Sequence, residues 1–245
     1  METKYIDSKH GYEIPYYIDI PTEAKRVIII SHGFGSSKDS PTAQMMLKGL
    51  PEQGIGAVAF DFPTHGESKA AVADLRVDNC IDDVRVMEEL VMKLQPKADI
   101  GYFSSSFGAY INLLFLGQGD HKGNKSFLRS AAVNMLSLFD DLTPAQQEEL
   151  KETGQVTVDD PPVAVSQAFL DDLKENDLFS SFMPDGTKLG MVHGNEDKII
   201  EPKIAVAFSA YYDVPAAFIP GGPHNLCGEG MPEQVFQMAL EFFEN

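Results

Sequence analysis

Short runs of apolar residues recur along the chain, separated by longer segments in which apolar residues return every three or four positions. The short runs are rich in β-branched residues, which is typical of strands covered on both faces. The longer segments are typical of helices with one apolar face. We expect strands over residues 26–30, 54–60, 98–103, 129–139, 187–193 and 215–220, and helices over about 41–52, 76–95, 107–115, 203–212 and from 232 onward.

Two earlier segments, residues 3–9 and 12–20, have a different pattern and predict a pair of strands. In the second segment, apolar and aromatic residues alternate with others, which is typical of a half-buried strand. Pro15 has no backbone N–H to donate to a neighbouring strand. We therefore expect the second strand to lie at an edge of the sheet.

The alternation of strands and helices predicts an α/β fold, in which a mostly parallel central sheet carries helices on both faces. We predict a single domain over residues 1–245. Between about 140 and 183 the alternation stops, and a capped helix start at Thr143-Pro144, a strand at 155–158 and a helix over 165–176 follow one another. We interpret this segment as a small lid inserted into the domain.

The composition narrows the range of partners. The net charge of −18 and the isoelectric point near 4.6 argue against nucleic acids and anionic membranes, which bind basic patches. We find neither a signal peptide nor an apolar run long enough to span a bilayer. Cys80 and Cys227 form no metal-binding pair and no disulfide framework, so we expect a cytoplasmic protein. The oligomeric state is left open.

Three serines stand between the predicted strand at 98–103 and the helix that follows it. A serine at the tip of such a sharp turn projects its hydroxyl above the sheet edge, and the residues two before and two after it must be small. Ser106 meets this requirement, with Gly108 after it and Ser104 where the usual pattern has a first glycine. The alternative is a serine-rich loop that caps a helix.

A serine hydroxyl becomes an effective nucleophile when a histidine takes its proton and a carboxylate orients that histidine. Suitable residues follow two later predicted strands, and the carboxyl ends of parallel strands meet at one edge of a sheet. We predict that Ser106 is the nucleophile, His224 the base and Asp197 the acid.

Other residues compete for these roles. The alternatives for the acid are Glu196, Asp140 and Asp141. The remaining histidines have simpler explanations: a place at the surface in polar segments (His10 and His121), turn geometry before a glycine (His32 and His193), and a loop hydrogen bond (His65).

Five motifs, in this order along the chain, resemble those of the α/β-hydrolase superfamily: His32-Gly-Phe-Gly, Asp61-Phe-Pro-Thr-His-Gly-Glu-Ser68, Ser104-Ser-Ser-Phe-Gly108, His193-Gly-Asn-Glu-Asp197 and Gly222-Pro-His224. Together they cover nearly the whole chain. The resemblance implies an acyl-enzyme mechanism in which the backbone N–H groups of Phe34 and Phe107 hold the oxyanion. It implies neither a cofactor nor a metal.

The position and size of the predicted lid look most like those of small carboxylesterases, including bacterial cinnamoyl (feruloyl) esterases. Phe34, Met135 and Phe179 are candidates for an apolar acyl-binding pocket, whereas Phe62 is at least as well explained as core. We expect hydrolysis of a small-molecule ester with a small or aromatic acyl group. The alternatives are a peptidase or amidase, an acyltransferase of the same fold, and a non-catalytic binding protein, against which the intact serine, acid and histidine set argues.

Overall fold

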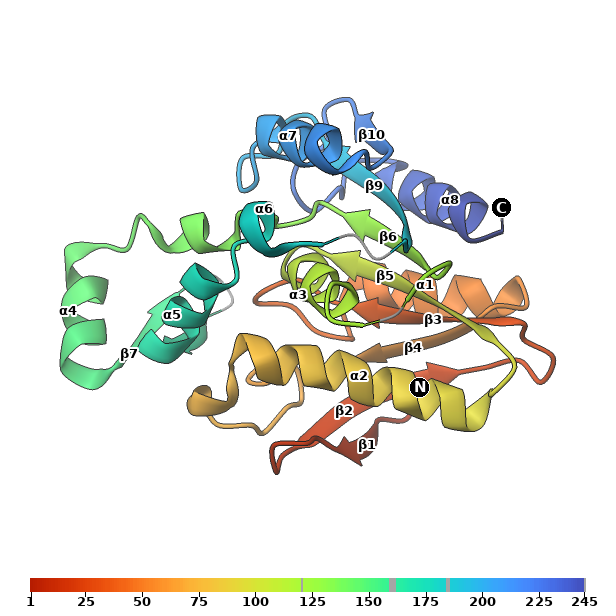
Figure 1. Cartoon of the computed structure of the whole chain (residues 1–245), viewed down its shortest axis with the longest axis horizontal. Helices are drawn as coiled ribbons and strands as arrows, with labels where there is room; N and C mark the ends of the chain where they lie inside the picture. Colours follow the sequence, from red (N-terminus) through yellow and green to blue (C-terminus); the bar gives the residue numbers. More distant parts are fainter. Residues whose placement is uncertain (120, 159–161, 184–185, 245) are drawn as a thin grey trace.

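The computed structural model describes residues 1–119, 121–158, 162–183 and 186–244 (Figure 1). Within these residues, eight strands form one sheet in the order β1-β2-β4-β3-β5-β6-β9-β10. The strands are β1 (Lys4–Asp7), β2 (Glu13–Asp19), β3 (Arg26–Ser31), β4 (Gly56–Phe60), β5 (Asp99–Ser105), β6 (Lys125–Arg129), β9 (Lys188–Gly194) and β10 (Ala216–Ile219). Neighbours from β4 to β10 are parallel, and β2 pairs antiparallel with β1 and β4. The predicted mostly parallel sheet is confirmed.

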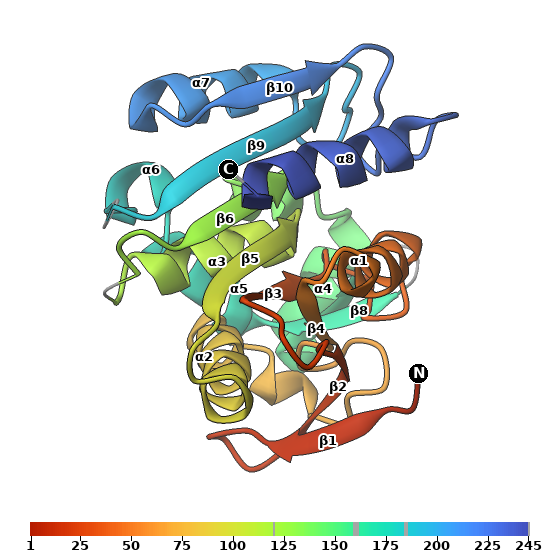
Figure 2. The ribbon, with the colours of Figure 1, turned by 90° about the vertical axis from the view of Figure 1, so that its right-hand side faces the viewer.

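Helices cover both faces of this sheet (Figures 1 and 2). On one face lie α1 (Pro41–Glu52) and α8 (Met231–Glu244), and on the other α2 (Val77–Leu94), α3 (Phe107–Leu116) and α7 (Pro202–Tyr212). The unbroken β-branched run of β3 serves both layers, because Ile28 and Ile30 belong to the α1 side and Val27 and Ile29 to the α2 side. None of the helices in the described residues has the length and apolar character needed to cross a membrane.

The prediction that the second strand lies at a sheet edge is wrong, because β2 is sandwiched between β1 and β4. Its pairing with β4 begins only at Tyr16, which lies opposite Phe60. Pro15 sits one position beyond that ladder, where its carbonyl oxygen accepts a hydrogen bond from the N–H of Asp61 at 2.9 Å. No donor is needed at this point, so the proline is tolerated in an internal strand.

The predicted strand over 129–139 is also wrong. The strand lies earlier, as β6, and Met135–Phe139 form a 3-10 helix. The sequence pattern missed β6 because charged residues stand at both of its ends. In the structure these residues, Lys125 and Arg129, are nevertheless buried. Lys125 is accommodated because its ammonium group donates a hydrogen bond to the carbonyl oxygen of Phe243 at 2.9 Å.

The segment predicted as a lid contains α4 (Pro144–Thr153), the antiparallel pair β7 (Gln155–Val158) and β8 (Val163–Ser166), α5 (Gln167–Glu175) and α6 (Leu178–Ser181). Figure 1 shows α4, β7 and α5 to one side of the main sheet. The sequence missed β8, and the helix expected from 165 begins only after Ser166, which caps it. Arg76, the residue before α2, donates a hydrogen bond to Asp172 of α5 at 2.6 Å and so connects this segment to the main body. A lid function, like the single-domain assignment, stays a prediction.

Candidate active site

Ser106 lies at a sharp turn between β5 and α3, with φ 49° and ψ −113°. A positive φ is strained for a residue with a side chain, and such strain is concentrated at functional sites. The turn presses α3 against the end of β3: a Cβ atom built on Gly108 would lie 2.5 Å from the carbonyl oxygen of His32. Glycine is therefore required at 108. Ser104 is fully buried beside Ser31 of β3, where a small side chain is sufficient.

Ser106, His224 and Asp197 form one chain of hydrogen bonds. His224 Nε2 lies 2.9 Å from Ser106 Oγ, and His224 Nδ1 lies 2.7 Å from Asp197 Oδ2. Asp197 follows β9 and His224 follows β10, and these two loops touch closely, because a Cβ atom on Gly194 would lie 2.1 Å from the carbonyl oxygen of Gly222. The structure thus brings together the three residues that the sequence singled out.

Asp197 is buried and accepts several hydrogen bonds. The N–H groups of Ile199 and Ile200 each donate to its Oδ1 at 2.9 Å, and His193 Nε2 lies 3.1 Å from its Oδ2. Burial opposes ionisation of this carboxyl group, but the hydrogen bonds from His193 and His224 outweigh burial and hold its pKa well below the ordinary value. Asp197 is therefore ionised, as the partner of a histidine that receives a proton must be.

His193 is a site residue that sequence reasoning assigned to turn geometry alone. Its ring is fully buried, and its Nε2 contacts Asp197 Oδ2, the same oxygen that His224 Nδ1 contacts. Its Nε2 is also 2.9 Å from the carbonyl oxygen of Ile200, so Nε2 carries the proton and donates. The spacing of four residues between His193 and Asp197 was the one available signal.

The two N–H groups predicted to hold an oxyanion flank Ser106. Phe107 is the first residue of α3, where backbone N–H groups have no partner within the helix. Phe34 follows Gly33, on which a Cβ atom would lie only 3.3 Å from Ser106 Cβ. The rings of Phe34 and Phe107 meet edge to face with centroids 5.7 Å apart. Their role in binding an oxyanion remains a prediction.

A cavity of about 310 Å³ opens beside this hydrogen-bond chain. Its lining includes Ser106, His224, Phe34 and, from the end of β6, Arg129. Met135 and Phe179, the other predicted acyl-pocket residues, are not in its lining: Met135 is buried in the core, and Phe179 packs against Phe208. Their predicted substrate contact is unsupported by these positions.

Two other histidines are buried near the cavity: His32 lines it, and His65 lies in the loop after β4. Burial lowers the pKa of His32 and of His65 to about 4, so both rings are neutral near pH 7. His32 Nε2 accepts a hydrogen bond from the N–H of Phe62 at 3.1 Å. His65 Nδ1 lies 2.8 Å from the carbonyl oxygen of Pro63, which confirms the expected loop hydrogen bond.

His121, expected at the surface, is buried instead, and its ring packs on Phe115 with centroids 4.5 Å apart. Nearby, Glu88 accepts a hydrogen bond from the Tyr102 hydroxyl at 2.5 Å. His10 is exposed as predicted. The alternative acids, Glu196, Asp140 and Asp141, are all exposed.

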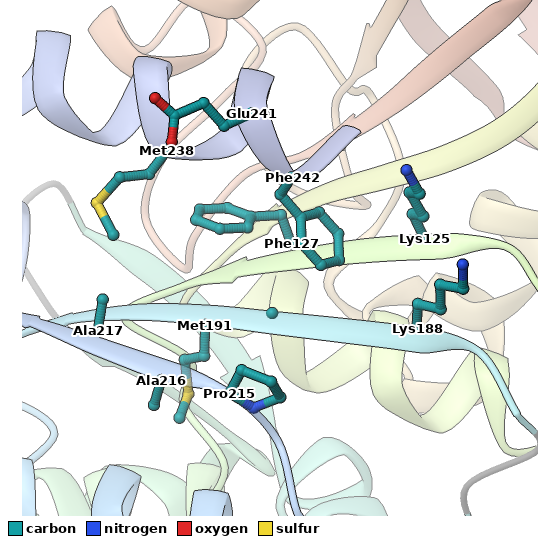
Figure 3. A pocket seen from close by; sticks show the side chains of 11 residues that line it. Lys125, Phe127, Lys188, Met191, Pro215, Ala216, Ala217, Met238, Glu241 and Phe242 are labelled. Atoms are coloured by element: carbon teal, nitrogen blue, oxygen red, sulfur yellow. The ribbon is translucent and has the colours of Figure 1, made fainter. Parts of the chain in front are cut away.

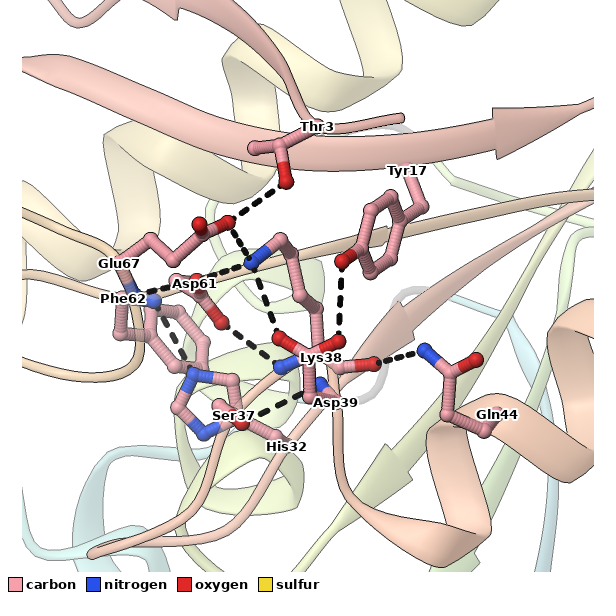
Figure 4. A network of polar contacts seen from close by, with 10 residues as sticks. All are labelled: Thr3, Tyr17, His32, Ser37, Lys38, Asp39, Gln44, Asp61, Phe62 and Glu67. Carbon is pink, nitrogen blue, oxygen red and sulfur yellow. Dashed lines mark hydrogen bonds and ion pairs between the residues drawn. The ribbon is translucent and has the colours of Figure 1, made fainter. Parts of the chain in front are cut away.

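The loop that carries Phe34 is held by a buried lysine (Figure 4). Lys38 Nζ lies 2.9 Å from Asp61, 2.6 Å from Glu67 and 3.2 Å from Asp39. The backbone N–H of Lys38 also donates to Asp61 at 2.7 Å. These contacts join the loop after β3 to the loop after β4, and so fix one wall of the cavity.

A second, more open cavity of about 580 Å³ lies between the β6–β9–β10 part of the sheet and α8 (Figure 3). Apolar side chains such as Phe127, Met191 and Phe242 line it, and Lys125 and Lys188 stand at one end. It shares no lining residue with the cavity at Ser106, so its larger volume does not make it the reactive site.

An eight-stranded, mostly parallel sheet with a serine at a strained strand-to-helix turn defines an α/β hydrolase. The family model described as serine aminopeptidase, S33, matches residues 22–182, which is more than half of the chain. The chain therefore belongs to this family of hydrolases. A search of curated proteins found no match.

Solved structures similar to this chain support the same fold. A putative hydrolase from Agrobacterium vitis S4 has a TM-score of 0.84 and 19% identity over 98% of each chain. Est1E from Butyrivibrio proteoclasticus with bound ferulic acid has a TM-score of 0.84 and 20% identity over 99% of this chain and all of that one. The esterase PF2001 from Pyrococcus furiosus has a TM-score of 0.71 and 18% identity, over 99% of this chain and 89% of that one.

Proposed function

We propose that this hydrolase cleaves carboxylic esters through an acyl-enzyme intermediate formed on Ser106. The observation that carries the proposal is the unbroken hydrogen-bond chain from Ser106 through His224 to Asp197. A serine, a histidine and a buried ionised carboxylate at these distances have the geometry of a catalytic triad.

In the proposed mechanism, Ser106 Oγ attacks the ester carbonyl carbon while His224 Nε2 takes the hydroxyl proton. Asp197, kept ionised by its lowered pKa, stabilises the resulting imidazolium. The N–H groups of Phe34 and Phe107 donate to the oxyanion. Collapse expels the alcohol, which takes its proton from His224. Water then attacks the acyl-enzyme by the same route, releasing the acid and restoring Ser106.

We propose an acyl group that is small or aromatic. Supporting this, the ring of Phe34 stacks against Phe169 of α5 at 6.2 Å and meets Phe139 edge to face at 5.8 Å. Because α5 belongs to segment 140–183, we propose that this segment acts as a lid next to the acyl site. The ferulic acid bound to the structurally similar Est1E supports an aromatic acyl group, and the low cysteine content supports a cytoplasmic location.

An ester is favoured over the amino-terminal peptide that the family description suggests. An aminopeptidase needs an acidic group to receive the charged amine of its substrate. The described residues that line the cavity include no aspartate or glutamate, and the charged residue among them is Arg129, a cation. The charge of the lining therefore disfavours an ammonium group.

The proposal is tested with p-nitrophenyl acetate, p-nitrophenyl butyrate and methyl ferulate as substrates of the wild type, Ser106→Ala and Ser104→Ala. We expect Ser106→Ala to lose at least about 10³-fold in kcat. Ser104→Ala is the matched control, since Ser104 is buried and should leave kcat within about twofold. Near wild-type turnover by folded Ser106→Ala would refute the assignment.

A further inference from the structure

Arg129 combines burial with a place in the reactive cavity. It is the last residue of β6, and its carbonyl oxygen accepts a hydrogen bond from the N–H of Ser106 at 2.9 Å. The residue is only 8% exposed and lines the same cavity as Ser106 and His224. A charged group is therefore built into the wall of the cavity, next to the nucleophile.

The guanidinium group of Arg129 has no carboxylate partner among the residues that the structure describes. It donates a hydrogen bond to the carbonyl oxygen of Asn225, in the loop that carries His224. The chain's other arginines each pair with an aspartate, as Arg26 with Asp99, Arg76 with Asp172 and Arg85 with Asp82. Arg129 thus differs from the chain's other arginines, whose charges are paired.

An unpaired buried charge is costly to the fold, and burial lowers the pKa of Arg129 to about 10, so it still carries its charge near pH 7. An anion that entered the cavity would offset this cost. The planar guanidinium matches the two oxygens of a carboxylate in a bidentate arrangement, which makes a carboxylate the best-suited anion. The overall charge of −18 repels anions, so a local cation would be needed to hold one.

We propose that Arg129 binds a free carboxylate carried by the substrate itself, so that the preferred substrate is a half-ester of a dicarboxylic acid. This inference rests on the proposed ester hydrolysis and deepens it by naming a substrate class. Ser106 attacks the ester carbonyl at one end of the molecule while Arg129 anchors the carboxylate at the other. One N–H group of Arg129 donates to the carbonyl oxygen of Asn225, and the remaining N–H groups are left for the ligand.

The test uses the monomethyl esters of succinic, glutaric and adipic acids. Each is compared with a neutral methyl ester in which a methyl group replaces the free carboxyl group. Hydrolysis is followed by titration of the released protons. We expect the wild type to favour at least one half-ester by tenfold or more in kcat/KM. Arg129→Met should lower kcat/KM for that half-ester by at least tenfold, mainly through KM, and should abolish the preference. Arg129→Lys should fall between. Arg26→Met, which removes an arginine remote from the cavity lining, should leave both rates unchanged.

Two results would overturn the inference. One is a wild type that hydrolyses the neutral esters at least as well as the half-esters, with turnover that depends on Ser106. The other is an equal loss on both substrates in Arg129→Met, which would assign Arg129 to holding the Asn225 loop. Free glutarate gives a readout without turnover: it should raise the melting temperature of Ser106→Ala but not of Ser106→Ala/Arg129→Met. Absent turnover together with absent glutarate binding would refute both proposals. Absent turnover with glutarate binding that needs Arg129 would refute the ester hydrolysis and retain Arg129 only as a carboxylate-binding residue.

Discussion

Two buried cations, Lys38 and Arg129, have opposite surroundings in the fold. Lys38 has a side chain with no exposed surface, and three carboxylates surround its ammonium group. Arg129 is almost as buried, but the one hydrogen bond of its guanidinium group to a described residue goes to a carbonyl oxygen. The lysine joins the loop after β3, which lines the cavity, to the loop after β4, whereas the arginine lines the cavity itself.

The difference is visible in how each environment treats the charge. Burial disfavours the Lys38 ammonium group, but hydrogen bonds to Glu67 and Asp61 outweigh it and raise the pKa of Lys38 above its ordinary value. For Arg129 burial dominates and lowers the pKa. A fully paired buried charge is therefore a structural connection, and an unpaired one beside a cavity is available to a ligand.

The largest expected effect follows from breaking the paired cation. Lys38→Met leaves Asp61 buried without its partner, and such losses cost about 3–5 kcal/mol in the free energy of unfolding. Urea unfolding measures this. Lys174→Met, which removes an exposed lysine paired with Asp171, is the control and should change nothing measurable. Equal losses in the free energy of unfolding for the two substitutions would contradict the structural role of Lys38.

A smaller effect is expected from His193, which donates to the third buried charge of the site, Asp197. His193→Phe keeps a ring of similar shape and removes the donor. We expect kcat for a neutral ester to fall about tenfold, equivalent to about 1.4 kcal/mol, with KM little changed, because His193 positions Asp197 without reaching the cavity. His10→Phe at the surface should leave kcat unaltered. An unchanged kcat in His193→Phe would contradict the positioning role.

The charge on Asp197 itself predicts a pH dependence of stability. Its pKa is lower in the folded state than in the unfolded state, so the stabilisation is complete above about pH 5 and is lost as the pH falls, because the unfolded chain then binds the proton more readily. Between pH 5 and pH 3 the wild type should lose about 1 kcal/mol more than Asp197→Asn in urea unfolding. Parallel losses in the two proteins would show that the folded carboxylate has no special stabilisation.

The smallest effect is expected from the unpaired cation. Arg129→Met leaves no buried carboxylate without a partner and removes one hydrogen bond, so the free energy of unfolding should change by less than about 1 kcal/mol. The same urea experiment measures it beside Lys38→Met. A loss as large as that of Lys38→Met would mean that Arg129 is a structural group like Lys38.

Much of the fold could be predicted because the strands that are covered on both faces consist of unbroken apolar runs, as in β3. β6 escaped because its charged ends, Lys125 and Arg129, find buried partners or a cavity that only the assembled fold supplies. Pro15 misled for a similar reason, since whether its missing N–H matters depends on where the neighbouring strand ends.

The candidate site could be predicted where neighbouring residues in the sequence indicate the role of a side chain. The small residues around Ser106 and the polar loops after two strands sufficed to select Ser106, Asp197 and His224. The supporting contacts were not predictable, because Lys38 meets Asp61 across 23 positions and Arg129 meets the carbonyl oxygen of Asn225 across 96. Such pairings depend on how the loops pack, which the pattern of apolar and polar residues does not predict.

The central claim, that His224 activates Ser106, is tested most directly by labelling with a fluorophosphonate probe and locating the modified peptide by mass spectrometry. We predict modification at Ser106 in the wild type and none in His224→Ala. Folded wild-type protein that remains unlabelled, or that carries the label on another serine, would contradict the account.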